Sequence, residues 1–96
     1  MLKLRPNCEH CDKDLPPTAD DARICSFECT FCAACVETVL HNVCPNCGGG
    51  LVPRPIRPKA KLAAAPASPD RVFKPVDPAR HQAFSETLMI TPPAER

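Results

Sequence analysis

Eight cysteines in four close-spaced pairs constrain this chain more than any other feature. The pairs are Cys8/Cys11, Cys25/Cys29, Cys32/Cys35 and Cys44/Cys47. A spacer of two or three residues lets both sulfurs of a pair reach one metal ion, and a structural zinc ion takes four cysteine or histidine ligands. Eight thiols in four pairs therefore predict two zinc ions, with all eight cysteines as ligands.

The small supply of large apolar side chains also favours a fold that depends on metal. The chain has 96 residues, four phenylalanines and no tryptophan or tyrosine. A core built from so few apolar side chains does not offset the entropy of ordering the chain. A structural zinc ion contributes roughly 10–16 kcal/mol, so two ions would add a term as large as the core itself. We therefore expect a small metal-stabilised α+β fold.

Disulfide bonds are the competing use of eight cysteines, and they need an oxidising compartment. The first residues, MLKLRPNCEH, contain no apolar run of signal-peptide length, and no stretch of the sequence is apolar enough to span a bilayer. We therefore expect a protein of the reducing cytoplasm that has no membrane partner. In that compartment metal binding is the preferred interpretation of paired cysteines.

Local patterns predict a short hairpin and one short helix around the cysteines. Strand-forming residues flank the ligands at 23–25 and 30–32, which suggests two short antiparallel strands. Residues 33–41 contain no glycine or proline, and Val36, Val39 and Leu40 recur at helical spacing. The glycines that follow Cys47 permit close turns in which backbone amides approach sulfur. We assign these elements to a metal module over residues 1–52.

After residue 52 the composition changes abruptly. Residues 53–96, called the tail below, contain nine prolines but no cysteine or glycine. A chain of this composition does not bury enough apolar surface to fold alone, so we predict a flexible, mostly disordered tail. Asp77-Pro78 is a typical helix start, with proline where its missing amide is harmless, and it predicts a short helix near 78–89.

The charge distribution bears on the partner. Residues 1–52 have a formal charge of −3 and residues 53–96 a charge of +4. Eight thiolates with two divalent ions would bring the module to −7, which argues against direct binding of a phosphate backbone. The tail carries a basic strip, which we interpret as a solvated linker because no aromatic side chains interleave to stack bases. Its residues are Arg54, Arg57, Lys59 and Lys61. Another protein is the expected partner, and nucleic acid is the less favoured one.

The order of the ligands resembles that of a RING finger with cysteine in place of the usual histidine at the fourth ligand, Cys29. The match covers residues 8–47 and includes Pro45 after the seventh ligand and Phe31 before the fifth. The resemblance implies a cross-brace, in which one zinc ion is bound by Cys8/Cys11/Cys32/Cys35 and the other by Cys25/Cys29/Cys44/Cys47. Spacing alone leaves open the sequential pairing, Cys8/Cys11/Cys25/Cys29 and Cys32/Cys35/Cys44/Cys47.

At the positions that distinguish RING ubiquitin ligases, this chain has residues that differ from those of a ligase. Between the first two ligands, where such ligases tend to place an aliphatic contact for the conjugating enzyme, this chain has Glu9 and His10. After the last ligand, where many have an arginine or lysine, it has Gly48. A ligase-like adaptor is therefore the second hypothesis.

A second resemblance extends over most of residues 1–75. The segments LRPNCE, CDKDLPP, ARICSFECTFCA and HNVCPNCGG are similar to a family of short bacterial cysteine-rich proteins known only as a domain of unknown function. This resemblance implies a bacterial cytoplasmic setting and no particular activity.

Other metal chemistry is a weaker interpretation. Cys29, Cys32 and Cys35 have the spacing that opens a ferredoxin-type iron–sulfur motif, but the gap before Cys44 is longer than that motif has. A redox sensor that releases zinc would need exposed thiolates of low pKa, and the sequence singles none out. His10 and His41 could replace a cysteine, but with eight thiols present we interpret them as surface groups or hydrogen-bond donors around the sites.

Together these observations predict a zinc-binding, non-enzymatic protein-interaction or adaptor module. Four thiolates around an ion leave no open position for water or substrate. The sequence also has no glycine-rich phosphate loop and no nucleophile–base pair whose spacing supports catalysis. A regulator that contacts nucleic acid through the basic tail is a third hypothesis.

Overall fold

The computed structural model describes all 96 residues and has a small α+β fold, as the sequence predicts. Its elements, in chain order, are β1 (Ala22–Ile24), β2 (Thr30–Cys32), α1 (Ala33–Cys35), η1 (Val36–Leu40), β3 (Val52–Pro53), η2 (Lys59–Lys61), α2 (Pro78–Ser85) and η3 (Pro93–Glu95). None of the helices is long and apolar enough to cross a membrane.

The three strands form an antiparallel sheet with the order β2-β1-β3. The hairpin of β1 and β2 has Arg23 opposite Phe31, and it lies within one residue of its predicted position. The third strand was not predicted, because its two residues are too few to show an alternating pattern. Phe31, the middle residue of β2, is fully buried. The hairpin therefore fixes the cysteines at its two ends, Cys25 and Cys32, relative to one another.

The predicted helix over 33–41 is present, but it widens after its first turn. α1 continues directly into η1, a π-helical turn whose Val36 and Leu40 are buried against the rest of the metal module. The amide of Asn42 donates to the carbonyl of Val36 at 3.2 Å. His41 then adopts a left-handed conformation (φ 52°) that ends the helix. The helical element thus begins beside Cys32 and ends just before Cys44.

Cysteines make up nearly half of the hydrophobic core. The core cluster has 11 buried residues, and five of them are cysteines. They are Cys8, Cys25, Cys32, Cys35 and Cys44. The remaining apolar side chains surround these thiols rather than forming a separate core. The packing of the module is therefore centred on its candidate ligands.

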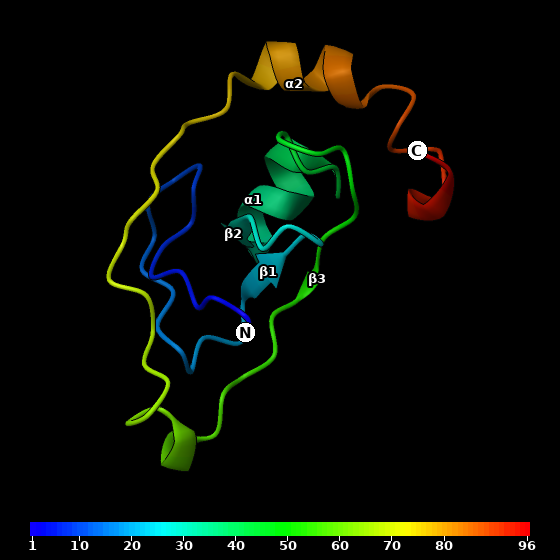
Figure 1. Ribbon diagram of the computed structural model, residues 1–96. Coiled ribbons are helices and arrows are strands. Elements are labelled where there is room, and N and C mark those ends of the chain that lie inside the picture. Colours follow the sequence, from blue (N-terminus) through cyan, green and yellow to red (C-terminus); the bar gives the residue numbers. More distant parts are fainter.

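The structure does not confirm the prediction of a mostly disordered tail. In Figure 1 the tail leaves β3, turns at η2, returns beside the N-terminal segment and crosses the end of the helical element as α2. The amide of Ser68 donates to the carbonyl of Leu4 at 2.9 Å. Arg57 donates to the carbonyl of Leu2 at 2.7 Å. The tail lacks a core of its own, as its composition indicates, and lies along the surface of the module.

The second half of the tail packs on the end of η1. α2 begins at Pro78 with Asp77 as its N-cap, whose carboxylate accepts a hydrogen bond from the amide of Ala79 at 3.0 Å. His81 is buried, and its Nε2 lies 2.8 Å from the carbonyl oxygen of Leu40. The chain after α2 also passes close to Gly48, where an added Cβ would lie 3.4 Å from Leu88. Gly48 has a φ of +78°, and this left-handed backbone conformation favours glycine at the turn.

The basic strip is not simply a solvated linker. Arg54 is buried, and its guanidinium donates to the carbonyls of Arg5, Leu15 and Pro16 at 2.8, 3.1 and 3.0 Å. Arg57 is half-buried through its own carbonyl contacts, whereas Lys59 and Lys61 remain exposed. Two of the four cations thus fasten the tail to the module. The sequence gives no sign of this, because the acceptors are backbone atoms distant along the chain.

Replacing Arg54 with alanine is expected to destabilise the metal-loaded protein by about 3 kcal/mol, because buried carbonyls lose their donor. Arg54→Lys should restore only part of this loss, since an ammonium lacks the planar fork that reaches several acceptors. Denaturant unfolding at a fixed free zinc concentration measures the difference, with Lys61→Ala as an exposed cationic control. Equal midpoints for Arg54→Ala and Lys61→Ala would contradict the clamping role.

Candidate metal centres

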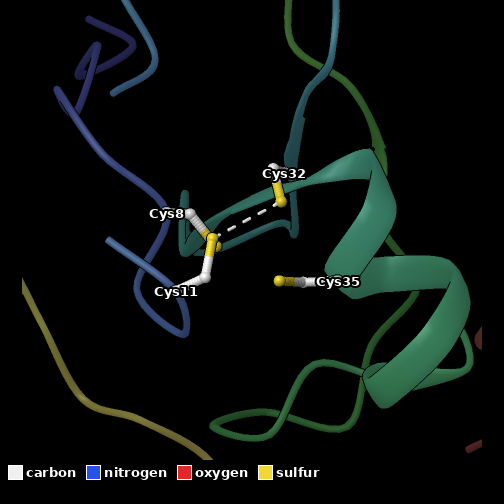
Figure 2. Close-up of side chains that lie close together, drawn as sticks. All are labelled: Cys8, Cys11, Cys32 and Cys35. Atoms are coloured by element: carbon white, nitrogen blue, oxygen red, sulfur yellow. Dashed lines mark hydrogen bonds between the residues drawn. The ribbon is translucent and has the colours of Figure 1, made fainter. Parts of the chain in front are cut away.

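The first candidate centre combines a knuckle with the start of the helical element. Cys8 and Cys11 lie on the N-terminal loop, Cys32 ends β2, and Cys35 ends α1. The four sulfurs all lie within 4.8 Å of one another, and Figure 2 shows the side chains converging on one point. Cys11 is exposed and the other three are buried. The centre is thus at the edge of the core.

The spacing of these sulfurs fits a single tetrahedral ion. Sγ of Cys11 and Sγ of Cys32 are 3.8 Å apart. A zinc–sulfur bond of ~2.3 Å in a regular tetrahedron places any two sulfurs about 3.8 Å apart. In a four-iron cluster each thiolate binds a different iron, so the sulfurs would lie farther apart than they do around one ion. The geometry therefore favours one ion shared by four thiolates.

The second candidate centre is less complete. The sulfurs of Cys25, Cys44 and Cys47 lie within 4.8 Å of one another. Cys29 is not part of this mutually close set, although its thiol interacts with that of Cys25. Its Sγ lies 3.4 Å from the Nδ2 of Asn46. Cys29 is therefore beside the centre as a fourth thiol, held by a side-chain amide as well as by its neighbour.

The two groups interleave along the chain. The first and third cysteine pairs form one centre, and the second and fourth pairs surround the other, so each centre joins segments that lie on either side of a ligand pair of the other centre. This grouping is the cross-brace arrangement implied by the RING resemblance and differs from the sequential alternative. An ion at either centre would therefore hold distant parts of the module together.

Burial acts on the pKa of several of the candidate ligands. Desolvation raises the pKa of Cys35 and of Cys44 far above the ordinary value for a thiol. Burial also acts on Cys25, but the backbone amides of Phe27 and Cys29 oppose it and leave its pKa lowered. A divalent ion reverses the cost of burying thiolates, because coordination deprotonates the thiol outright. The buried thiols are thus suited to a cation rather than to free thiolate chemistry.

Backbone amides approach two of the candidate ligands, as the turn residues predict. The amide of Phe27 donates to Sγ of Cys25 at 3.3 Å, and the amide of Gly49 donates to Sγ of Cys47 at 3.4 Å. Such N–H groups offset part of the negative charge that four thiolates bring to one ion. Both bonds belong to the second centre.

A buried carboxylate links the second knuckle to the first, and sequence analysis missed it. Glu9 is only 3% exposed. Its carboxylate accepts from the amide of Thr30 at 3.1 Å and from the side chain of Asn46 at 3.3 Å. Asn46 also contacts Cys29, as described above, so one amide group touches both Glu9 and a candidate ligand. A polar residue between paired cysteines was the only available signal, and it did not distinguish a buried carboxylate from an exposed one.

The histidines belong to neither group of thiols. Nδ1 of His10 accepts a hydrogen bond from the amide of Val76 at 2.9 Å. His41 ends the helical element, and His81 is buried against Leu40. Two of the three histidines therefore connect the tail to the module.

Comparison with known proteins assigns the first 57 residues. They match the family DUF1272, described as proteins of unknown function. The uncharacterized protein R02474 of Rhizobium meliloti (strain 1021) is 65% identical over 75 residues, which cover 78% of this chain and 89% of that protein. No solved structure matches the chain. Both metal groups lie within the matched residues, and the predicted resemblance to a bacterial family of unknown function is confirmed: the chain belongs to the DUF1272 family.

Proposed function

We propose that the protein is a small, non-enzymatic module that binds two zinc ions, RING-like in ligand order, and presents a surface to a protein partner. The observation that carries this proposal is the first centre, where four thiols from two distant knuckles converge at the sulfur spacing of one tetrahedral ion. Zinc is the preferred ion because four thiolates from paired cysteines are typical of structural zinc.

The proposal of a structural role follows from the coordination number. Four thiolates complete a tetrahedron and leave no position for water or substrate, unlike the three-ligand sites of zinc enzymes. The burial of Cys8, Cys32 and Cys35 supports the same role, since the ion would lie against the core. The ions then act by holding the surface of the module in one shape.

The ligase-like alternative receives no support from the first knuckle. Glu9 stands where a RING ligase tends to place an exposed aliphatic contact, but its side chain is turned inward to Thr30. His10 is engaged by the tail through Val76. A partner of a different kind is therefore proposed below.

Native mass spectrometry of protein purified under reducing conditions tests the proposal. We expect two zinc ions per chain. Acidification should release both ions, and the chain should take up eight protons as it does so, because each ligand binds as a thiolate. Iron, or a single ion per chain, would refute the two-zinc module. A Lys61→Ala protein, altered at an exposed residue far from the thiols, serves as the control and should retain both ions.

A further inference from the structure

The tail crosses the outside of the first knuckle in an unusual hydrogen-bonded register. Residues 66–77 contain no helix, turn or bend, and this part of the chain runs outstretched beside the N-terminal segment in Figure 1. The amides of Val72, Lys74 and Val76 donate to Oδ1 of Asn7, the carbonyl of Glu9 and Nδ1 of His10, at 3.3, 2.8 and 2.9 Å. Residue 73 makes no such bond and residue 75 is proline. Alternate amides thus face the module, as in a strand added to a sheet edge.

The side-chain amide of Asn7 pairs with both backbone polar groups of one residue, Val72. Asn7 is 1% exposed, and its amide nitrogen donates to the carbonyl of Val72 at 2.9 Å while its amide oxygen accepts from the N–H of the same residue. A buried side chain amide that pairs with both backbone groups of an outstretched residue selects for chain conformation rather than for a side chain. It also fixes the register of the segment on the knuckle.

Two aspartates, Asp12 and Asp14, bind the side chain of Arg71, the residue before Val72. The guanidinium of Arg71 donates to the carboxylates of Asp12 and Asp14, each at 2.9 Å, and to the carbonyl of Asp12 at 3.0 Å. An arginine fork matches several acceptors at once, whereas a lysine does not. The knuckle therefore recognises an arginine followed by backbone amides at alternate positions.

The contact between residues 71–76 and the first knuckle has features that let another segment replace these residues. The side chains of Phe73 and Lys74 are exposed, and the ion pairs of Arg71 lie at the surface, where such pairs contribute little. Only the end of the segment, Val76, packs against the core cluster. The tether, rather than the contact, keeps the segment in place, because linked segments meet at an effective concentration in the millimolar range.

We propose that the outer face of the first knuckle is a docking site for an outstretched, arginine-bearing segment of a partner protein, and that residues 71–76 occupy it as a built-in competitor. The proposal rests on the proposed function as an interaction module and names the class of partner. The acidic charge of residues 1–52 favours a basic segment. The docking residues 7–14 lie within the family match, whereas the occupying segment lies beyond it.

The test uses the full-length zinc-loaded chain and a fluorescein-labelled peptide of residues 68–77. Val72→Pro with Lys74→Pro removes two of the donating amides and should free the site, whereas Phe73→Pro removes an amide that the module does not use. Measured by fluorescence anisotropy, the double variant should bind the peptide at least tenfold more tightly than the wild type does. The Phe73→Pro variant should behave as the wild type, because its tail remains docked.

Two further measurements separate specific docking from general attraction. Asp12→Asn with Asp14→Asn, added to the double proline variant, should weaken peptide binding about threefold, because Arg71 loses two surface ion pairs. Both side chains are exposed, and asparagine at position 12 keeps an oxygen that can accept from Asn7. A scrambled peptide of the same composition should bind at least tenfold more weakly than the native one. Equal binding of the two peptides would overturn the proposal, since it would show attraction by charge alone.

Other outcomes would overturn the docking proposal and leave the proposed zinc module unaffected. A double proline variant that retains two zinc ions by native mass spectrometry yet binds no peptide would refute the docking site and leave the proposed zinc function standing. Arg71→Glu, which frees the site by charge reversal, gives a second release variant should the prolines disturb folding, and the same expectations apply to it. A wild-type dimer that becomes monomeric in either release variant would identify the occupant as the tail of a second copy and exclude a foreign partner.

Discussion

Removal of both ions should unfold the module completely rather than loosen it. Treatment with excess EDTA under reducing conditions is expected to abolish the helical signal in circular dichroism and to collapse the amide dispersion in a 1H–15N NMR spectrum. The physical reason lies in the core, where five of 11 buried residues are cysteines. Two structural zinc ions at roughly 10–16 kcal/mol each exceed the total stability of about 5–15 kcal/mol that small domains have.

The same experiment contains its own controls. EDTA already saturated with zinc should leave the spectrum unchanged, and adding zinc to the chelated protein should restore it. The signals of α2 are informative, because this helix has only eight residues and packs on η1. It should be lost with the module, since so short a helix is not stable alone in water. Metal-dependent folding would be contradicted by protein that is metal-free by mass spectrometry and still has the native amide dispersion.

The parts of the fold that sequence predicts well are those whose signals are local. The hairpin and the helical element follow from strand-forming residues beside the ligands and from a short run without glycine or proline. The start of α2 follows from Asp77 and Pro78, because this pair is typical of a helix start. Each of these signals is local in the sequence, so no knowledge of distant contacts is needed. The pairing of cysteines had local signals too, but the interleaving of the pairs came only from a resemblance.

The course of the tail could not be predicted, because composition reports on burial of apolar surface and the tail is held by something else. Its contacts run from arginine side chains and backbone amides to acceptors on the module, such as those from Arg54 to Leu15 and from Val72 to Asn7. Backbone acceptors have no sequence signature. A proline-rich segment without glycine also remains outstretched, which suits it to lie along a surface. The composition therefore indicated that the tail has no core of its own, but it carried no signal of the contacts that lay the tail along the module.

The position of Cys29 was also beyond local reasoning. Its spacing predicts a ligand equal to the other seven, and the structure places its thiol beside Cys25 but outside the mutually close set. The amide of Asn46 contacts both Cys29 and the buried Glu9. A network that joins residues 9, 29 and 46 depends on the interleaved fold, so it appears only when the fold is known.

The interleaving itself predicts a large and selective effect of paired cysteine substitutions. Cys11→Ser with Cys35→Ser removes two ligands of the first centre and none of the second, so the variant should keep one zinc ion that resists a competing chelator as it does in the wild type. With sequential pairing the same two changes would take one thiolate from each site and weaken both. Native mass spectrometry after chelator competition counts the remaining ions.

Cys11→Ser with Cys47→Ser is the matched control, because it takes one ligand from each site under either pairing. Both cysteines are exposed, so the control disturbs packing little. It should lose both ions at a chelator concentration that spares the ion in the first variant. If the two double variants lose zinc alike, the pairing is sequential and the interleaved grouping is wrong. If they differ as expected, the ion that survives is held by a site that shares no ligand with Cys11 and Cys35, which is the result that the interleaved grouping requires.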